Sequence, residues 1–134
     1  MSAPAYTTIP ATIDLQIDEG LQRILVTISG PVSGRRVGPV IGGMFLDRPE
    51  LSAFDMLYDL LDYTGDVEAE HLKPIMEAYA ACEPDPSVSC RTAFATLDPN
   101  FSFWAEAMNF QFPGREHRAF RTIAEAESFL VSAR

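Results

Sequence analysis

The fold is decided by residues 12–29, which read TIDLQIDEGLQRILVTIS. Polar and apolar residues alternate on both sides of the turn at Glu19-Gly20. The apolar positions of this pattern are Ile13, Leu15, Ile17, Ile24, Val26 and Ile28. Alternation is typical of a strand with one buried face, and two such runs around a glycine-containing turn predict a β-hairpin.

After the hairpin, turn residues divide the chain into helical and extended segments in alternation. We expect a first helix around Val40 to Phe45, with Pro39 in its opening turn, where the missing N–H of proline has no partner to lose. A strand over residues 54–61 follows. The next helix contains Pro74, which either kinks its first turn or marks the start of the helix proper.

The last third of the chain predicts two more strand–helix pairs. A strand over residues 88–97 leads to a helix from Asn100 to Phe112, capped by Asp98-Pro99 and ended by Pro113-Gly114. A strand over 116–121 leads to a capping box, Thr122 to Glu125, and a final helix. That helix is expected to bury Ala126, Phe129, Leu130 and Ala133. The order β-β-α-β-α-β-α-β-α predicts an α/β fold with a mixed five-stranded sheet and four helices, because strands joined through helices pair in parallel.

The length of 134 residues fits one domain, which we expect over residues 11–134 after a flexible leader at 1–10. An apolar fraction of 47% is too high for a disordered chain. The longest uncharged apolar run, residues 37–46, is half a bilayer span and contains three glycines and a proline, which argues against a transmembrane helix. No signal peptide is recognised at the N-terminus, so we expect a cytoplasmic protein.

The formal net charge is −9, and its excess lies in one region. Residues 44–86 contain eleven acidic and two basic residues, whereas the remainder contains eight of each. Such a surface repels nucleic acid and anionic membranes, both of which are bound through Lys and Arg. Arg115, Arg118 and Arg121 form the single local basic cluster, which is too small for a DNA-binding footprint. We therefore expect no nucleic-acid partner.

The sequence indicates neither a metal site nor a catalytic one. Cys82 and Cys90 lack the paired spacing of zinc ligands and are expected to be buried or half-buried free thiols, while His71 and His117 are expected on the solvent side. The candidate nucleophiles Ser33, Ser52, Cys82 and Cys90 stand outside any recognisable nucleophile motif. The glycine-bearing residues 33–38 lack the spacing of a phosphate-binding loop. We therefore expect neither an enzyme nor a cofactor.

Two segments resemble the SpoIIAA-like family of small stand-alone bacterial proteins, whose fold is that of STAS domains. One segment is Tyr58-Asp59-Leu60-Leu61-Asp62-Tyr63-Thr64-Gly65, and the other runs from Arg118 to Leu130 and ends on an aromatic–Leu pair. The resemblance spans nearly the whole chain after Ala11. It implies a non-catalytic domain whose work is binding, and we expect a protein-interaction module that docks through the acidic surface around Thr64 and the second helix.

In phosphorylatable STAS proteins the third strand ends in an Asp-Ser-Ser-Gly motif, and the last serine is phosphorylated. The matching residues here are Asp62, Tyr63, Thr64 and Gly65, which puts Thr64 at the phosphoacceptor position. The alternative is that Thr64 and Asp66 simply cap the second helix, at a cost of about 1 kcal/mol when Thr64 is changed to Ala. The acidic residues that follow favour the cap, because they would repel a phosphate.

The helix from Asn100 to Phe112 is apolar on more than one side. One stripe consists of Phe101, Trp104, Ala105, Met108 and Phe112, and we expect Trp104 to be mostly buried. Phe103 and Phe110 lie off that stripe. They either contact neighbouring structure or a second subunit, or they line a cavity of a few hundred cubic ångströms for an apolar ligand such as a lipid. The similarity of the SpoIIAA-like family to lipid-carrier folds suggests this second role, or a membrane-proximal one. We prefer the first alternative, contact with neighbouring structure or a second subunit.

Overall fold

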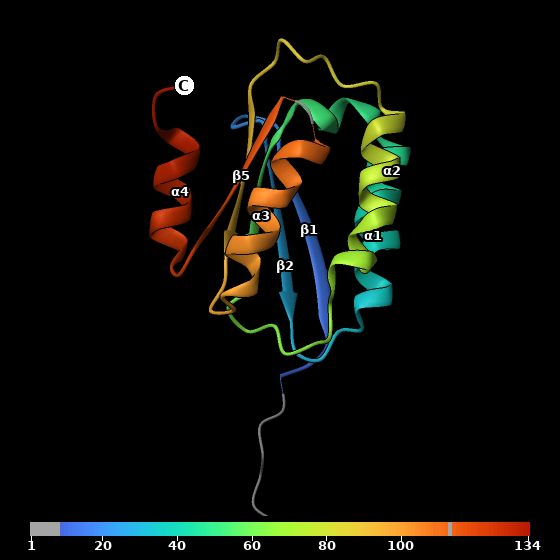
Figure 1. The fold of residues 1–134 in the computed structure, drawn as a ribbon, viewed down its shortest axis with the longest axis vertical. Helices are drawn as coiled ribbons and strands as arrows, with labels where there is room; N and C mark the ends of the chain where they lie inside the picture. The colour runs from blue at the N-terminus through green and yellow to red at the C-terminus, as the bar shows by residue number, and fades with distance from the viewer. Residues whose placement is uncertain (1–8, 113) are drawn as a thin grey trace, which may run out of the picture.

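The computed structural model describes residues 9–112 and 114–134, and these residues form five strands and four α-helices (Figure 1). Their bounds are β1 Thr12–Asp18, β2 Arg23–Ser29, α1 Gly34–Asp47, β3 Asp55–Asp59, α2 Lys73–Ala81, β4 Cys90–Ala95, α3 Asn100–Gln111, β5 Arg115–Phe120 and α4 Ile123–Val131. Two short 3₁₀ helices, Pro49–Ala53 and Ala69–Leu72, precede β3 and α2. The predicted element order is confirmed.

The strands form one sheet in the order β1-β2-β3-β4-β5. β1 and β2 are an antiparallel hairpin in which Thr12 lies opposite Ser29, and every later neighbour pairs in parallel. The predicted mixed sheet is therefore confirmed. Because β2 to β5 run in parallel, the loops that follow them gather at one end of the sheet, which is where α/β proteins usually place their sites.

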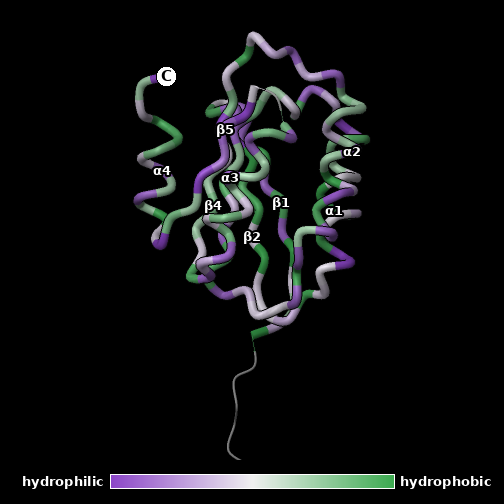
Figure 2. The backbone as a smooth tube through the Cα atoms, viewed as in Figure 1, coloured by the Kyte–Doolittle hydropathy of each residue, from purple (hydrophilic) through white to green (hydrophobic). Residues whose placement is uncertain are grey.

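Helices cover the two faces of the sheet unequally. The face that carries Ile24, Val26, Tyr58 and Phe94 packs against α1, α2 and α3, and it contains the larger core. Among the described residues, the other face packs against α4, through a small cluster around Phe129. Figure 1 shows α4 alone on one side of the sheet and α1 and α2 on the other. Figure 2 shows β2 as largely hydrophobic and the loop between α2 and β4 as largely hydrophilic.

α1 and α2 pack closely because α1 presents glycines to α2. A Cβ atom on Gly38 would lie 2.5 Å from the carbonyl oxygen of His71, and one on Gly42 would lie 3.0 Å from that of Pro74. Gly43, on the exposed side of α1, has no neighbour within 4 Å of such an atom. Close backbone approach therefore explains two of the helix glycines.

The boundaries of several segments differ from the sequence expectations. The strands expected over 54–61, 88–97 and 116–121 span Asp55–Asp59, Cys90–Ala95 and Arg115–Phe120. α1 begins at Gly34, so Pro39 lies inside the helix and not in its opening turn; it is tolerated there because both Pro39 and Arg35, whose carbonyl loses its partner, are exposed. α2 begins at Lys73, which settles the two alternatives for Pro74 in favour of a helix start. Ala133 lies beyond α4 and is exposed, because the helix ends at Val131.

Three remaining expectations concern the chain ends and the helix lengths. The expected leader falls mostly on residues 1–8, and the expected helix stop falls partly on Pro113; both lie outside the described residues. Of the leader, Ile9 and Pro10 are described and exposed. Within the described ranges, no helix combines the length and the apolarity needed to cross a bilayer.

Candidate functional site

The loop after β3 contains the residues that match the phosphorylated motif of STAS domains. Thr64 is exposed, and its backbone N–H donates to the carbonyl oxygen of Gly30 at 3.0 Å. The next helical residue is Ala69, and the cap of that 3₁₀ helix is Glu68, whose side chain pairs reciprocally with His71. Thr64 therefore caps no helix, and the expectation that it does was wrong.

Asp66 is a cap, but of a different helix. Its Oδ1 accepts the backbone N–H of Gly34 at 2.7 Å, which places the carboxylate at the start of α1. This hydrogen bond lowers the pKa of Asp66. Ser33 adds a second, longer contact, with its Oγ accepting the N–H of Arg35 at 3.3 Å. The expectation that Asp66 caps the second helix was therefore wrong, because its carboxylate binds the backbone of Gly34, which lies far away in the sequence.

Tyr63 fixes the shape of this loop. Its hydroxyl donates to the carbonyl oxygen of Val32 and accepts the backbone N–H of Val67, both at 3.0 Å. Partial burial raises the pKa of Tyr63. Gly65 packs so closely on Val32 and the Tyr63 ring that a side chain there would collide with them. Thr64 is thus an exposed hydroxyl on a well-braced loop, beside the exposed carboxylate of Asp62.

The aromatic helix α3 divides its side chains between the core and solvent. Phe101 and Met108 are buried, and the Phe101 ring lies 5.7 Å from that of Phe94 in β4. Trp104 packs against the core with only part of its side chain exposed, as expected, and meets Phe101 edge-on at 4.8 Å. The core stripe predicted for this helix is otherwise buried, with Ala105 and Phe112.

Phe103 and Phe110 point away from the core. Phe103 is 71% exposed and Phe110 is 90% exposed, and Ala107 between them is exposed as well. We call these three residues the α3 face. Glu106 is the only charged residue of α3. Neither phenylalanine belongs to the core or lines the interior cavity, so the cavity-lining role that the carrier hypothesis assigned to them is wrong.

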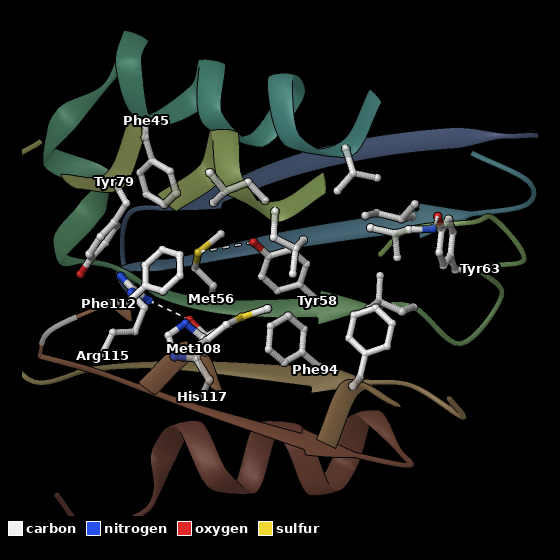
Figure 3. Close-up of a pocket in the computed structure, with 18 residues that line it drawn as sticks. Phe45, Met56, Tyr58, Tyr63, Tyr79, Phe94, Met108, Phe112, Arg115 and His117 are labelled. Carbon is white, nitrogen blue, oxygen red and sulfur yellow. Dashed lines mark hydrogen bonds between the residues drawn. The ribbon is translucent and has the colours of Figure 1, made fainter. Parts of the chain in front are cut away.

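An apolar cavity of about 40 Å³ lies between the sheet and helices α1, α2 and α3 (Figure 3). Phe45, Met56, Phe94 and Phe101 contribute to its walls. Figure 3 shows Tyr63 at one end and Arg115 and His117 toward the other. This volume accommodates a few water molecules, whereas sites for organic ligands span hundreds of cubic ångströms.

Arg115 is a buried cation at the cavity end, which the sequence did not reveal. It is 4% exposed. Its Nη2 donates to the carbonyl oxygens of Ser52 at 2.9 Å and Phe54 at 2.7 Å, and its Nη1 donates to Thr92 Oγ1 at 3.0 Å. The guanidinium also lies 5.2 Å from the centre of the Tyr79 ring. Arg115 therefore ties the segment before β3 to β4 and α2.

His117 lies beside Arg115 and is 5% exposed, so the expectation of a solvent-side histidine was wrong. Asn109 Oδ1 accepts the His117 backbone N–H at 2.6 Å and lies 3.2 Å from the ring Nδ1. Burial, together with the charge of Arg115, lowers the pKa of His117 to about 3, so the ring is neutral. The signal that could have found both residues is the alternation of β5, which puts Arg115, His117 and Ala119 on the face under α3.

No protein-family model and no curated protein matches this sequence. In structure, the chain is similar to an uncharacterised protein of the DUF3478 family from Shewanella loihica PV-4, whose crystal structure is described as SpoIIAA-like in fold. The TM-score is 0.53, and the match covers 97% of this chain and 98% of that protein at 14% sequence identity. The chain has a SpoIIAA-like fold. At this identity the likeness extends to the fold alone, and it confirms the fold expected from residues 58–65 and 118–130.

The described part of this SpoIIAA-like fold contains no nucleophile hydrogen-bonded to a histidine. The Cys82 thiol donates to the carbonyl oxygens of Phe45 and Ala78, and the Cys90 thiol donates to that of Ser52. Burial raises the pKa of both thiols, which disfavours the reactive thiolate. Cys82 is half-buried and Cys90 buried, as expected.

The acidic and metal-ligating side chains of this SpoIIAA-like fold are dispersed over the described residues. Among the residues with described positions, no three His, Cys, Asp or Glu side chains lie close enough together to hold an ion. The acidic residues of the region 44–86 are instead used singly, as with Asp66 at the start of α1.

Proposed function

We propose that this protein is a non-catalytic binding module that docks a protein partner through the α3 face. The observation that carries the proposal is the exposure of Phe103 and Phe110, at 71% and 90%, on one side of one helix. Single exposed apolar residues are common, whereas two phenylalanines two turns apart on one side of a helix form an apolar patch, which supports a contact site. Aromatic side chains supply most of the binding energy in protein interfaces.

The charge of the molecule supports a protein partner over the other classes. α3 contains no Lys or Arg, whereas helices that lie on membranes carry them along their polar side. The net charge of −9 further disfavours anionic lipid and nucleic acid. The acidic loop around Thr64, which the sequence suggested as the docking surface, is the less favoured location because its side chains are polar and its backbone is braced internally.

The test is chemical cross-linking in the native cell followed by mass spectrometry. We expect the Phe103→Ser, Phe110→Ser double variant to lose the cross-linked protein that the wild type captures. The matched control is Leu46→Ser, since Leu46 is a 64% exposed apolar residue on α1. All three side chains are exposed, so folding is unaffected. An unchanged set of cross-linked partners in the double variant would show that the α3 face binds no protein.

A carrier of an apolar small molecule is the second candidate, and the apolar lining of the cavity favours it. At about 40 Å³ the cavity is too small for a lipid, so this function needs α3 to move away from α2, parting the contact between Tyr79 and Phe112, whose rings are 5.1 Å apart. Titration with a fatty acid, followed by the emission of Trp104, tests it. We expect no saturable change; a stoichiometric one would establish the carrier.

A further inference from the structure

We propose that the partner of the α3 face is a second copy of the same chain, bound by antiparallel packing of the two α3 helices about a two-fold axis. This assignment rests on the proposed function, since it names the occupant of the same surface. Four observations support it: the spacing of the exposed residues, the local charge, the state of the neighbouring sheet edge, and the exposed area.

The α3 face is nearly symmetric about its own centre. Phe103 and Phe110 are seven residues apart with Ala107 between them, which is the four-three spacing by which helices pack side by side. An antiparallel copy therefore places Phe103 against Phe110 of the partner subunit, and the reverse pair follows by symmetry. Ala107 lies near the axis, where a small side chain lets the helices approach. Such self-complementarity is the requirement of a two-fold dimer contact.

Charge decides where two copies of this chain can approach each other. At a net charge of −9, copies repel each other over most of their surface. α3 carries one charged residue, Glu106, and therefore offers a nearly neutral face. A foreign partner selected by charge would instead be expected at the acidic region 44–86. A neutral aromatic face on an acidic protein thus favours an identical face as its partner.

The neighbouring edge strand β5 is closed to strand pairing over its first half. The backbone N–H of His117 donates to Asn109 Oδ1 at 2.6 Å, and that of Arg115 donates to the carbonyl oxygen of Phe112 at 3.1 Å. Asn109 belongs to α3, and Phe112 directly follows it. A second copy that binds on this side of the molecule would therefore contact the side chains of α3 and not the edge of the sheet.

The exposed area indicates a weak dimer. At the given exposures, two phenylalanine side chains contribute about 300 Å² per copy, whereas a stable interface buries about 800 Å² per partner. Trp104, which is half-buried, and the groove between α3 and β5 beside Glu106 and Arg118 supply additional contacts. We therefore expect a dimer that forms and dissociates with concentration.

Sedimentation velocity over about a thousandfold range of concentration tests the dimer. We expect the wild type to pass from monomer to dimer, with the emission of Trp104 shifting to shorter wavelength as the dimer forms. The Phe103→Ser, Phe110→Ser variant should associate at least about tenfold more weakly, and Leu46→Ser should match the wild type. A wild type that remains monomeric throughout overturns the inference.

Salt distinguishes a second copy from a foreign partner of opposite charge. Added salt should strengthen the dimer, because it screens the repulsion between two acidic chains. In the antiparallel arrangement Glu106 lies on the same flank as Glu106 of the partner subunit, so Glu106→Gln should also strengthen it. Weakening by salt or by Glu106→Gln would contradict this arrangement.

Disulfide trapping tests the orientation. In a Cys82→Ser background, Ala107→Cys should cross-link to its own copy near the axis. Asn100→Cys is the matched control, since the exposed Asn100 lies two turns before Ala107 on the same side of α3; it lies about 20 Å along the axis from its own copy and should not cross-link. Equal cross-linking of both variants indicates parallel helices and overturns the antiparallel dimer.

Failure of this inference is distinguishable from failure of the proposed function. If the wild type is monomeric but the double variant loses a cross-link to a different protein, the second copy is wrong and the docking role of the α3 face stands. If the double variant changes neither self-association nor cross-linking, both are wrong.

Discussion

On one face of the sheet three helices cover a core of large aromatic side chains, with Arg115 and His117 buried among them. On the other face α4 alone covers a cluster that includes three alanines, Ala93, Ala95 and Ala126. Small side chains give little apolar area, and α4 is held in addition by polar contacts at its C-terminal end. The first face is thus stabilised by apolar packing around the buried Arg115. The second is stabilised by Arg91, which binds the C-terminal end of α4.

The largest expected effect is that of Arg115→Met. The substitution keeps the volume but removes the guanidinium donor from the carbonyl oxygens of Ser52 and Phe54, and Ser52 keeps only the weak Cys90 thiol. We therefore expect a loss of about 3 kcal/mol or more in the free energy of unfolding. Urea denaturation measures it. Arg118→Met is the control, since the Arg118 side chain lies on the same strand and is 58% exposed. Equal stabilities of the two variants would contradict the role given to Arg115.

Arg91 is the corresponding residue on the α4 side. Its Nη1 donates to the carbonyl oxygen of Phe129 at 2.6 Å and to that of Ser132 at 3.0 Å, where the helix dipole also favours a cation. We expect Arg91→Met to lose about 2 kcal/mol and to speed hydrogen exchange in α4 before any change in α1 or α2. The stability of Arg91→Lys should lie between those of the wild type and Arg91→Met, because lysine keeps the charge but lacks the planar set of guanidinium donors. Uniform acceleration across all helices would show that the two faces unfold together.

His117 predicts a pH dependence that belongs to the first face. Its folded-state pKa of about 3 lies below the unfolded value of about 6.5, so the unfolded chain binds a proton that the folded chain does not. Stability is therefore fully present above about pH 6.5 and declines toward pH 3, by about 2 kcal/mol between pH 6.5 and 5. In urea titrations, His117→Gln should reduce the change in the free energy of unfolding between pH 6.5 and 5, whereas His71→Gln should retain it. An unchanged slope in His117→Gln would refute the assignment.

The smallest effect is expected for Thr64→Ala. The hydroxyl forms no hydrogen bond to any residue with a described position, and the side chain belongs to neither core, so we expect a change below about 0.5 kcal/mol. Asp66→Ala, two residues later, should lower the melting temperature more, because it removes the cap of α1. A larger effect at Thr64 than at Asp66 would reverse the reading of this loop.

The sequence was informative where the signal is local. The alternation of residues 12–29 predicted the hairpin, and the capping box was found as expected, with Thr122 Oγ1 accepting the N–H of Glu125 at 3.1 Å. Sequence analysis failed for contacts between residues that lie far apart in the chain. Asp66 and Arg115 bind groups 32 and 61 to 63 residues away, and no spacing rule reveals such contacts. His117 was misplaced because its polarity was taken to indicate exposure, whereas the strand period fixed its face.

The candidate surface was predicted in part. The sequence placed Phe103 and Phe110 off the buried stripe, and both are exposed. The sequence could not exclude that they line a cavity, because the helical period shows which residues share a side of the helix but not whether that side faces solvent or a cavity. Thr64 matched a motif position, but the distance between it and the following helix depends on how the loop folds onto Gly30.

The bond between Gly34 and Asp66 has a consequence for the order in which the protein assembles. The N-terminal end of α1 is completed by a carboxylate that lies 32 residues later in the chain. A chain emerging from the ribosome therefore makes α1 without its full cap until the third strand and the loop after it have also been synthesised. Contacts of such sequence separation slow folding. We expect α1 to be only transiently helical in the nascent chain and to become stable together with β3.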